Sequence, residues 1–387
     1  MKEQLESSVT YHNTTKVSAI ALTKQPQIGQ VANELKLLTL PVPRPAKNQV
    51  AIQLIASSMH IDEIYAAQGT ALGRFYAPKN ISVNNPHIMG SSVSGIVVAI
   101  GSSIKQFKLG DEVVVIPNES GENGSWATYR CVSARYVMLK PSNMSHVAAA
   151  AIMLSACVAW GALRTANIKA GERCLVIGAS GAIGSVLVQV LKAKSAYVTG
   201  VCSAANAKLV RTLGADNTLD YQSTEFTAEK ANTFDKVFDL VGGLRNEAAA
   251  YRWLKLGGKF ITVVGPVQYL GERKLSRKEF FQSVCHVMWR SISTIFRGPR
   301  YKFCATLPRH VAQDAMQFAS EHKIHSPIEM EVPFNLKRIQ DAIGVLTSHR
   351  TRGRIVIRFE NSELPENPEN RAESSIEESP LSQCNGH

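Results

Sequence analysis

The stretch that decides the fold is CLVIGASGAIGSVLVQV, from Cys174 to Val190. An apolar run precedes its glycines and another follows them, which predicts a strand, a tight turn and a helix. A second apolar strand, from Ala196 to Val201, follows at the distance expected for a crossover between parallel strands. The pattern therefore predicts a doubly wound parallel sheet of the Rossmann type, which binds a dinucleotide at this turn.

The turn itself is predicted to hold the pyrophosphate of the dinucleotide. Gly181 lets the backbone approach the phosphates, and Gly184 lets the helix pack close to the strand. The N–H groups at the start of the helix add donors and the positive end of a dipole. Ala179 stands at the first glycine position of G-x-G-x-x-G, and a plain glycine-rich turn is the alternative. The predicted contacts are Gly178, Ala179, Ser180, Gly181, Ala182, Ile183 and Gly184.

Length and composition indicate a globular protein with more than one core. A chain of 387 residues is long for one core, and 45% hydrophobic and 19% charged residues are typical of soluble proteins. Seven cysteines without a C-x-x-C pair favour a reducing compartment. Residues 1–16 show no signal or transit sequence and are predicted to be a disordered leader. We expect a cytoplasmic protein, with an organellar or membrane-peripheral location left open.

Charge is unevenly distributed along the chain. The net charge is +12, but residues 360–387 contain seven Glu and one Arg, so residues 1–359 carry +18. The acidic end is predicted to be a disordered tail. Basic residues concentrate in 272–302, a segment suited to phosphates, acidic lipids or an acidic partner, or else a solvated helix face. No nucleic-acid-binding motif occurs in the sequence, so no nucleic-acid partner is predicted.

Apolar residues recur at helical intervals within this basic segment, between residues 280 and 295. The spacing predicts an amphipathic helix. Two interpretations stay open: the helix lies on a membrane or over the substrate pocket, or it packs on the core of the parallel-sheet domain. Whether the chain forms a homodimer also stays open.

The N-terminal half is rich in short β-like segments. These strands are predicted at residues 17–22, 35–40 and 49–57. Their density predicts an antiparallel, barrel-like domain. Two glycine-containing turns follow, in HIMGSSVSGIVVAIG at residues 87–101 and in FKLGDEV at residues 107–113.

These patterns resemble the medium-chain dehydrogenase/reductase superfamily. The resemblance rests on G-x-x-x-x-G-x-V-x-x-x-G from Gly90, on F-K-x-G-D-x-V, on the A-S-G-x-x-G turn and on LGAD at 213–216. More narrowly, the chain is similar to the zinc-independent quinone oxidoreductases, including the reticulon-interacting oxidoreductases, and to the enoyl reductases. The resemblance implies an α/β fold with a GroES-like β-barrel domain at 17–150, rejoined by 310–359, and a Rossmann NADP-binding domain at 151–309.

Zinc ligands are missing where zinc-dependent members of that superfamily carry them. Those members have a first-domain Cys and a G-H-E triplet at the bend, whereas this chain has no Cys before Cys131 and reads Gly90-Ser91-Ser92 there. Zinc needs three or four converging N, S or O ligands. No metal is therefore predicted, and His60, which has no partner at metal spacing, is interpreted as a pocket or core residue.

Cofactor choice is read at the end of the second Rossmann strand, where an acid would hold the ribose hydroxyl of NAD. Residues 201–208 contain no acid. Ser203 and Lys208 can instead hold the 2′-phosphate of NADPH, and the resemblance adds Tyr221 beside it. The alternative for Lys208 is an exposed helix lysine. NADPH is the predicted cofactor.

The nicotinamide side of the site is predicted at the carboxyl ends of two later strands. These contribute Val241, Val264 and Gly265. The resemblance adds Arg354, near the last strand, as a cofactor-facing residue, with a surface salt bridge as the alternative. By similarity to the enoyl-thioester reductases, Tyr76 is the candidate proton donor, and the alternative is an ordinary loop aromatic.

Together these features predict an NADPH-dependent, zinc-independent oxidoreductase that reduces a quinone or an α,β-unsaturated carbonyl. Hydride transfer is the chemistry of the cofactor, so the protein supplies position, a dry pocket and a proton. The alternative from another class is a non-enzymatic NADPH-binding adaptor that uses residues 272–302 to meet a membrane or a protein partner.

Overall fold

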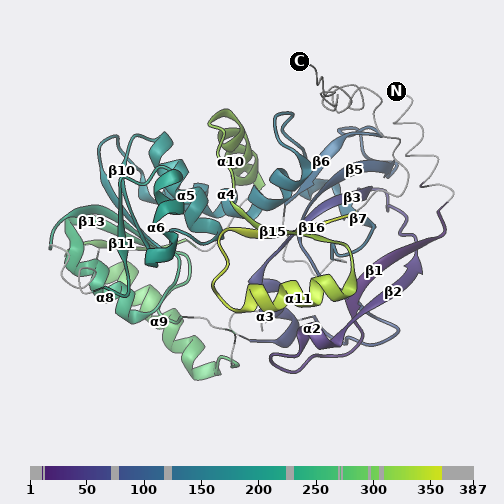
Figure 1. Ribbon diagram of the computed structural model, residues 1–387, viewed down its shortest axis with the longest axis horizontal. Helices are drawn as coiled ribbons and strands as arrows, with labels where there is room; N and C mark the ends of the chain where they lie inside the picture. The colour runs from purple at the N-terminus through teal and green to yellow at the C-terminus, as the bar shows by residue number, and fades with distance from the viewer. Residues whose placement is uncertain are drawn as a thin grey trace, which may run out of the picture.

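Two large β-sheets lie side by side, with helix α4 (His146–Ala166) between them (Figure 1). The computed structural model describes residues 11, 14–70, 78–116, 124–223, 231–268, 271, 273–294, 298–304 and 309–359. Tyr76, the acidic tail 360–387 and part of the basic segment 272–302 lie outside these residues.

One sheet is the predicted Rossmann sheet, with all its strand pairs parallel in the order β11-β10-β9-β12-β13-β14. Its strands are β9 (Arg173–Ile177), β10 (Tyr197–Cys202), β11 (Asn217–Asp220), β12 (Phe234–Asp239), β13 (Leu254–Thr262) and β14 (Arg300–Phe303). Its helices are α5 (Ala182–Ala193), α6 (Ala207–Thr212), α8 (Leu244–Trp253), α9 (Arg277–Ser293) and α10 (Arg309–Glu321). The strand order reverses between β9 and β12, where ligands bind in such sheets.

The other half is mostly antiparallel and matches the predicted barrel-like domain. A seven-stranded sheet has the order β15-β16-β3-β5-β6-β8 with β7 paired to β3, and a smaller sheet has the order β2-β1-β4. Its strands are β1 (Lys16–Leu22), β2 (Leu35–Pro41), β3 (Gln49–Met59), β4 (His87–Ile88), β5 (Ser92–Ile100), β6 (Glu112–Val115), β7 (Tyr129–Ser133), β8 (Val137–Leu139), β15 (Ile328–Pro333) and β16 (Arg354–Arg358). Its helices are α2 (Val31–Glu34), α3 (Ile61–Gln68) and α11 (Leu336–Thr347). The α/β fold class is thus confirmed.

The chain returns to the barrel-like half through β15 and β16, and β16 pairs antiparallel with β3. This return starts later than the predicted residue 310. Helix α10 still belongs with the Rossmann side, because its Met316 and Phe318 pack in the same core as α4 and α5, and the Phe318 ring lies 4.6 Å from that of Trp160.

Helix α4 is the shared wall of the two halves. By length and hydropathy it could cross a bilayer, but 61% of its most apolar window is buried inside the protein. It contacts strands of both sheets, including β3, β5 and β13. We interpret α4 as a core helix, and no other helix in the described part of the chain meets the same length and hydropathy criteria.

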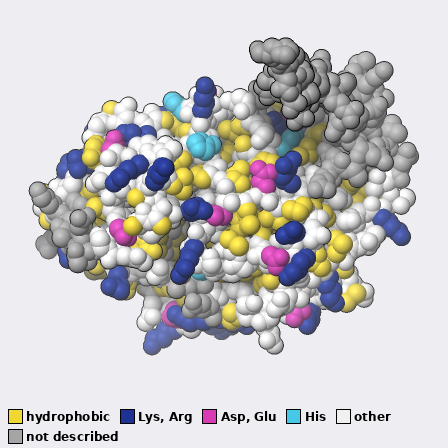
Figure 2. Space-filling view, in the orientation of Figure 1, with side chains coloured by type: hydrophobic (Ala, Val, Ile, Leu, Met, Phe, Trp, Pro, Cys, Tyr) yellow, Lys and Arg dark blue, Asp and Glu magenta, His cyan; other side chains and the backbone are white. Residues whose placement is uncertain are grey.

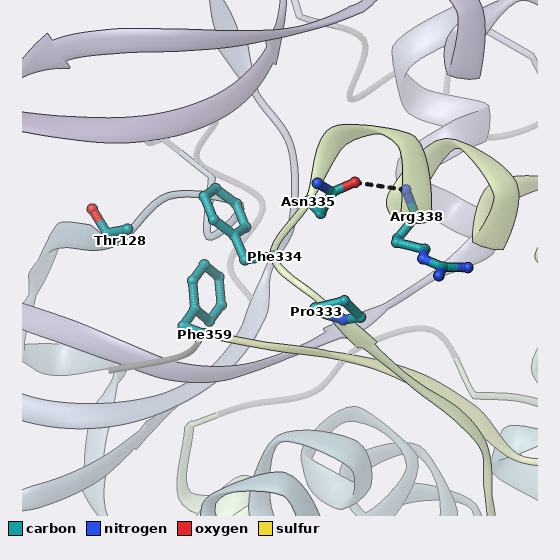
Figure 3. A pocket seen from close by; sticks show the side chains of 6 residues that line it. All are labelled: Thr128, Pro333, Phe334, Asn335, Arg338 and Phe359. Carbon is teal, nitrogen blue, oxygen red and sulfur yellow. Dashed lines mark hydrogen bonds between the residues drawn. The ribbon is translucent and has the colours of Figure 1, made fainter. Parts of the chain in front are cut away.

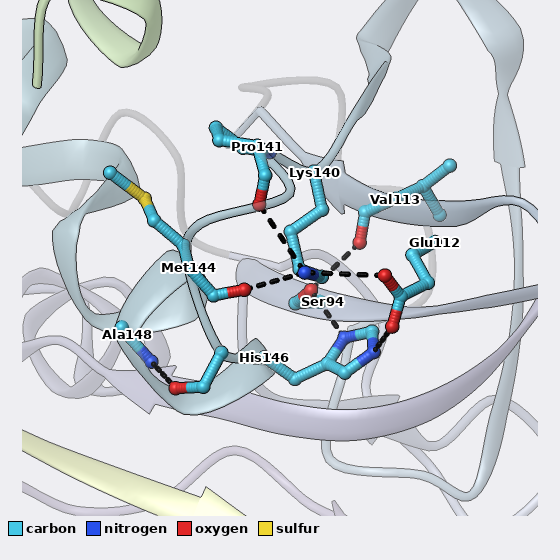
Figure 4. A network of polar contacts seen from close by, with 9 residues as sticks. Ser94, Glu112, Val113, Lys140, Pro141, Met144, His146 and Ala148 are labelled. Atoms are coloured by element: carbon cyan, nitrogen blue, oxygen red, sulfur yellow. Dashed lines mark hydrogen bonds and ion pairs between the residues drawn. The ribbon is translucent and has the colours of Figure 1, made fainter. Parts of the chain in front are cut away.

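A polar clamp attaches the start of α4 to the barrel-like sheet (Figure 4). The two ring nitrogens of His146 lie 2.8 Å from Ser94 Oγ and 2.9 Å from Glu112 Oε1, and Lys140 Nζ lies 3.3 Å from Glu112 Oε2. The set has the order of a hydrolytic Ser–His–Glu triad. Ser94 is fully buried, however, and its hydroxyl also donates to the Val113 carbonyl at 2.8 Å. The clamp therefore fixes a helix and offers no accessible nucleophile.

The prediction that residues 1–16 form a disordered leader is wrong at Tyr11. This side chain is fully buried, its ring lies 5.5 Å from that of Tyr129, and its hydroxyl donates to the Pro43 carbonyl. The sequence offered no periodicity around Tyr11 that would have indicated this contact.

Candidate active site

The glycine-rich turn connects β9 to α5 as predicted. Gly178 follows β9 with φ +86°, a conformation that favours glycine. The N–H groups of Gly178 and Ala179 donate to the Val201 carbonyl at 3.1 and 3.0 Å, which ties the turn to β10. Gly181 is the N-cap of α5, and Ala182, Ile183 and Gly184 form its first turn. First-turn N–H groups have no acceptor within their own helix and so are available to an anion.

The two diagnostic glycines have different surroundings. A Cβ at Gly184 would lie 2.1 Å from the Gly178 carbonyl oxygen and 2.8 Å from Ala179 Cα, so only glycine fits between helix and turn. A Cβ at Gly181 would meet nothing nearer than the same oxygen at 3.4 Å. The protein itself therefore leaves space at Gly181, and this open cradle beside the α5 N-terminus fits a pyrophosphate.

The barrel-like half touches this turn through Gly353. Its N–H donates to the Ser180 carbonyl at 3.3 Å, and Gly353 forms a parallel bridge with Gly181. A Cβ at Gly353, where φ is +80°, would lie 2.0 Å from the Pro327 carbonyl oxygen. The segment before β16 can thus approach the turn only with glycine at this position.

A hollow of about 430 Å³ lies beside the turn, between the start of α6 and β15. Lys208 and Arg352 both line it, and Asn206, also in its wall, donates to Ser180 Oγ at 3.2 Å. Arg352 is held by Glu329, with Nε–Oε2 and Nη2–Oε1 both at 3.1 Å. Asn206 thus connects the hollow that Lys208 lines to Ser180 of the predicted pyrophosphate cradle.

Two further predicted phosphate contacts lie outside the lining of this hollow. Ser203 follows β10 as the N-cap of a short 3₁₀ turn, Ala204–Asn206, and is half-buried. Tyr221 follows β11 and is 53% exposed. The structure therefore links Ser180 to the wall of this hollow through Asn206, and leaves Tyr221 at the surface.

The predicted nicotinamide wall gathers at the carboxyl ends of β9, β12 and β13. A Cβ at Gly178 would lie 3.0 Å from Val241 Cγ2, and one at Gly242 would lie 2.6 Å from Val264 Cγ1. The N–H of Gly243 donates to the Gly265 carbonyl at 3.0 Å. Val241, Val264 and Gly265 thus form one edge beside the glycine-rich turn.

Asp239, which sequence reasoning did not single out, holds this edge in place. Its carboxylate accepts from the N–H groups of Gly242 at 2.9 Å and Val241 at 3.1 Å, and the Thr262 hydroxyl lies 3.4 Å from it. Burial raises the pKa of Asp239 to about 6, while these hydrogen bonds favour the charged form. Aspartate at a strand end before two glycines is the signal that could have identified it.

Arg354 is placed in a buried polar cluster. It is 7% exposed, and its Nη1 donates to His60 Nδ1 at 2.7 Å while Nη2 donates to Ser155 Oγ at 2.8 Å. Burial lowers the pKa of Arg354 to about 10, against the opposing charges of Asp62 and Glu63, so the guanidinium stays charged at neutral pH. Gly353, the residue before Arg354, contacts the turn. The buried guanidinium therefore belongs to the residue next to this contact.

His60 is the predicted pocket or core histidine, and it is 2% exposed. Burial, and then the Arg354 charge, hold its pKa well below the ordinary value, so the ring is neutral. Since Nδ1 accepts from Arg354, the proton belongs on Nε2. That buried nitrogen has no hydrogen-bond partner among the described residues.

Glu63 completes the cluster in the first turn of α3. Its Oε1 accepts from the Ser91 hydroxyl at 2.6 Å, and its Oε2 lies 3.4 Å from the His60 N–H. Burial raises the pKa of Glu63 to about 7, despite these two hydrogen bonds. Ser91 belongs to the Gly90–Ser92 bend, so the bend presents a serine–carboxyl pair that is partly protonated at neutral pH.

Sequence reasoning missed Glu63, Ser91 and Ser155. Acidic residues after a strand are the ordinary pattern of a helix N-terminus, where they favour the helix dipole. Ser155 lies within an apolar helix and gives no signal of its own. The contacts of these residues join segments 28 to 199 positions apart, which no local pattern records.

A second hollow, of about 460 Å³, lies elsewhere on the barrel-like half (Figure 3). Phe334 and Phe359 pack against each other in its wall, with ring centroids 4.7 Å apart. Asn335 caps α11 by accepting from the Arg338 N–H at 3.2 Å. This hollow contains none of the predicted site residues, and its groups have structural roles.

Two family models match the chain: the alcohol dehydrogenase GroES-like domain over residues 46–142, and the zinc-binding dehydrogenase domain over residues 213–357. The mitochondrial NAD(P)H oxidoreductase RTN4IP1 of Homo sapiens is 31% identical over 329 residues, which are 80% of this chain and 81% of that protein. The chain belongs to the medium-chain dehydrogenase/reductase superfamily. It is an oxidoreductase of the zinc-independent branch of that superfamily, as the sequence predicted.

Other superfamily members extend the comparison. The 2-methylene-furan-3-one reductase of Solanum lycopersicum is 27% identical over 323 residues, covering 82% of this chain and 73% of that reductase. The solved structure of the quinone oxidoreductase from Coxiella burnetii shares the fold, with a TM-score of 0.72 at 22% identity over 89% of this chain and 99% of that one. Within the described ranges, no three His, Cys, Asp or Glu side chains gather closely enough to hold a metal ion.

Proposed function

We propose that this protein uses NADPH to reduce a quinone or an α,β-unsaturated carbonyl. The observation that carries the cofactor choice is the hollow next to the glycine-rich turn, where Lys208 stands and no acid follows β10. The substrate class is supported by the relatives: one is named for an enone, and the structural neighbour is named for a quinone.

Each part of the cofactor has a proposed place on this chain. Gly181 and the first turn of α5 hold the pyrophosphate, while Lys208 pairs with the 2′-phosphate. Val241 and Val264 form the apolar wall that excludes water from the reacting ring. NADPH, when bound, supplies the hydride. Ser203, Tyr221 and Arg354 stay predicted cofactor contacts, Arg354 from its place beside Gly353.

A proton must accompany the hydride when a conjugated double bond or a quinone is reduced. We propose Glu63 as its source among the described residues. Its carboxyl bonds Ser91 of the bend and feels the charge of Arg354, the residue after the Gly353 contact with the turn, and burial raises its pKa to about 7. The Ser91 hydroxyl, 2.6 Å from Glu63 Oε1, can accept this proton and release its own to the reduced substrate. Tyr76 stays a second predicted donor outside the described residues.

A single panel experiment separates this proposal from the adaptor alternative. The purified full chain is mixed with NADPH or NADH and with quinones, enones or enoyl-thioesters, and cofactor oxidation is followed by absorbance. We expect turnover with at least one class, and a lower KM for NADPH than for NADH. Tight NADPH binding without turnover on any substrate would instead identify an adaptor. The cytoplasmic location stays a prediction, since the human relative is named as mitochondrial.

A further inference from the structure

Helix α9 is an exposed part of the Rossmann half. It spans 17 residues, none of which is buried. Ser276 caps its start by accepting from the Glu279 N–H at 3.1 Å, and Glu279 accepts in return from the Ser276 N–H at 2.9 Å. A capping box of this kind makes the helix a defined element. The large apolar side chains of α9 are therefore not explained by packing in the core of the protein.

One face of α9 holds the helix to the protein. His286 Nε2 lies 2.8 Å from Glu247 Oε2, and Arg290 Nε lies 2.7 Å from Glu247 Oε1. The Arg290 guanidinium also stacks over the Tyr251 ring at 4.1 Å, and Val287 packs against the core. These contacts are largely polar and leave the opposite face uncovered.

The opposite face carries large apolar side chains. Phe281 is 68% exposed, Trp289 is 69% exposed and Met288 is 58% exposed, and Ile292 and Val284 extend the stripe. At about 100° of rotation per residue, these side chains cover an arc of about 140° centred away from the anchoring face. An amphipathic helix normally turns this stripe inward, and here it faces solvent.

The charges beside the stripe are positive. Lys274, Arg277 and Lys278 are exposed at the N-terminal end of α9. The single acid of the helix, Glu279, is already engaged by Arg273, with N–O distances of 2.6 and 2.9 Å. The stripe is therefore bordered by cations that have no acid of α9 left to neutralise them.

We propose that α9 docks this protein on a membrane surface that contains anionic lipid. Aromatic and aliphatic side chains on one face and lysine or arginine at the border are the features of helices that lie in the lipid interface. A second copy of the chain would fit worse, because the cations that border the stripe would meet their own copies across a symmetric contact. Figure 2 shows Lys and Arg side chains spread over the visible face of both halves.

The proposal is tested by vesicle flotation of the full chain, without cofactor or substrate. Vesicles of phosphatidylcholine alone are compared with vesicles that also contain phosphatidylserine. We expect binding only to the anionic vesicles. Phe281→Glu combined with Trp289→Glu should lower affinity about tenfold or more, since two interfacial aromatic anchors are lost. Lys278→Ala should lower it about fivefold.

The control variant is Leu139→Glu, which changes an equally exposed apolar residue on β8 of the barrel-like half. It should leave vesicle binding unchanged, and the thermal unfolding of all variants should match the parent chain. Equal binding to neutral vesicles, or undiminished binding of the double variant, would overturn the proposal. A dimer in sedimentation that the double variant converts to monomer, with no vesicle binding by the parent chain, would identify the face as a contact between copies instead.

Discussion

The glycine-rich turn after β9 and the buried cluster around Arg354 meet at Gly353, yet they are built in opposite ways. The turn consists of consecutive residues, Gly178 to Gly184, and works through backbone groups and the absence of side chains. The cluster takes its side chains from α3, α4, β16 and the bend before β5. A backbone site depends on local steric space, whereas a side-chain site depends on desolvation and on distant partners.

The two sites also differ in whether they contain ionisable side chains. The turn offers N–H dipoles to a ligand and changes no pKa. The cluster buries ionisable groups, which raises the pKa of Glu63 to about 7 and lowers that of Arg354 to about 10. The first site is therefore suited to binding and the second to proton transfer, and variants in each should fail in different ways.

The largest effect is expected for Glu63→Gln. The amide keeps a hydrogen bond to Ser91 but cannot release a proton, so kcat should fall by about 10²–10⁴. In the parent chain the protonated carboxyl is the donor, and activity should hold below pH 7 and decline above it. The pH–kcat profile of the variant should lack this decline while its cofactor affinity stays normal.

The same substitution has a stability readout. The folded pKa of Glu63 lies above the ordinary 4.5, so the folded state binds the proton more tightly than the unfolded chain does. Its contribution to stability is complete below pH 4.5 and is lost as pH rises through 7. Glu63→Gln should remove this pH dependence. An unchanged pH–kcat profile in the variant would show that the proton comes from elsewhere, with Tyr76 as the next residue to change.

An intermediate effect is expected from one substitution made at two glycines. Gly184→Ala gains about 1 kcal/mol of helix propensity, but its Cβ must displace backbone 2.1 Å away, at a cost of about 3 kcal/mol or more. We expect a net loss of about 2 kcal/mol in denaturant unfolding. Gly181→Ala has space and should fold normally, yet bind NADPH more weakly because its methyl group enters the phosphate cradle.

These two variants serve as controls for each other. Calorimetry of cofactor binding and denaturant unfolding are measured on both. If Gly181→Ala binds NADPH as tightly as the parent chain, the phosphates do not lie in this cradle. If Gly184→Ala unfolds like the parent chain, the close approach of helix and turn is not a determinant of stability.

A more selective effect, of similar size but confined to one of two cofactors, is expected for Lys208→Ala. Loss of one charge-assisted contact costs about 1.5–3 kcal/mol, so NADPH affinity should fall roughly ten- to a hundredfold. NADH has no 2′-phosphate and is the internal control, since its affinity should hardly change. Equal weakening of both cofactors would mean that Lys208 supports α6. No change in either would shift the phosphate contact to Arg211, one turn further along the same helix.

The comparison also separates what could be predicted from what could not. The doubly wound sheet, the turn and the absence of an acid after β10 follow from contiguous residues, so a single sequence reveals them. Arg354 could be placed near the cofactor only by resemblance. Its contacts with His60 and Ser155 could not be predicted from the sequence. Tyr11 shows the same limit, because a buried contact with Tyr129 leaves no periodicity in a short leader.

By itself, the sequence determined the parallel sheet, the antiparallel half and the position of the dinucleotide turn, because apolar periodicity and glycine placement act over a few neighbouring residues. Only the tertiary structure decided that Glu63 meets Ser91, that Arg354 meets His60, and that α9 turns its apolar stripe outward. Those outcomes depend on which distant surfaces bury each group, and burial sets both the pKa of a carboxyl and the exposure of a helix face.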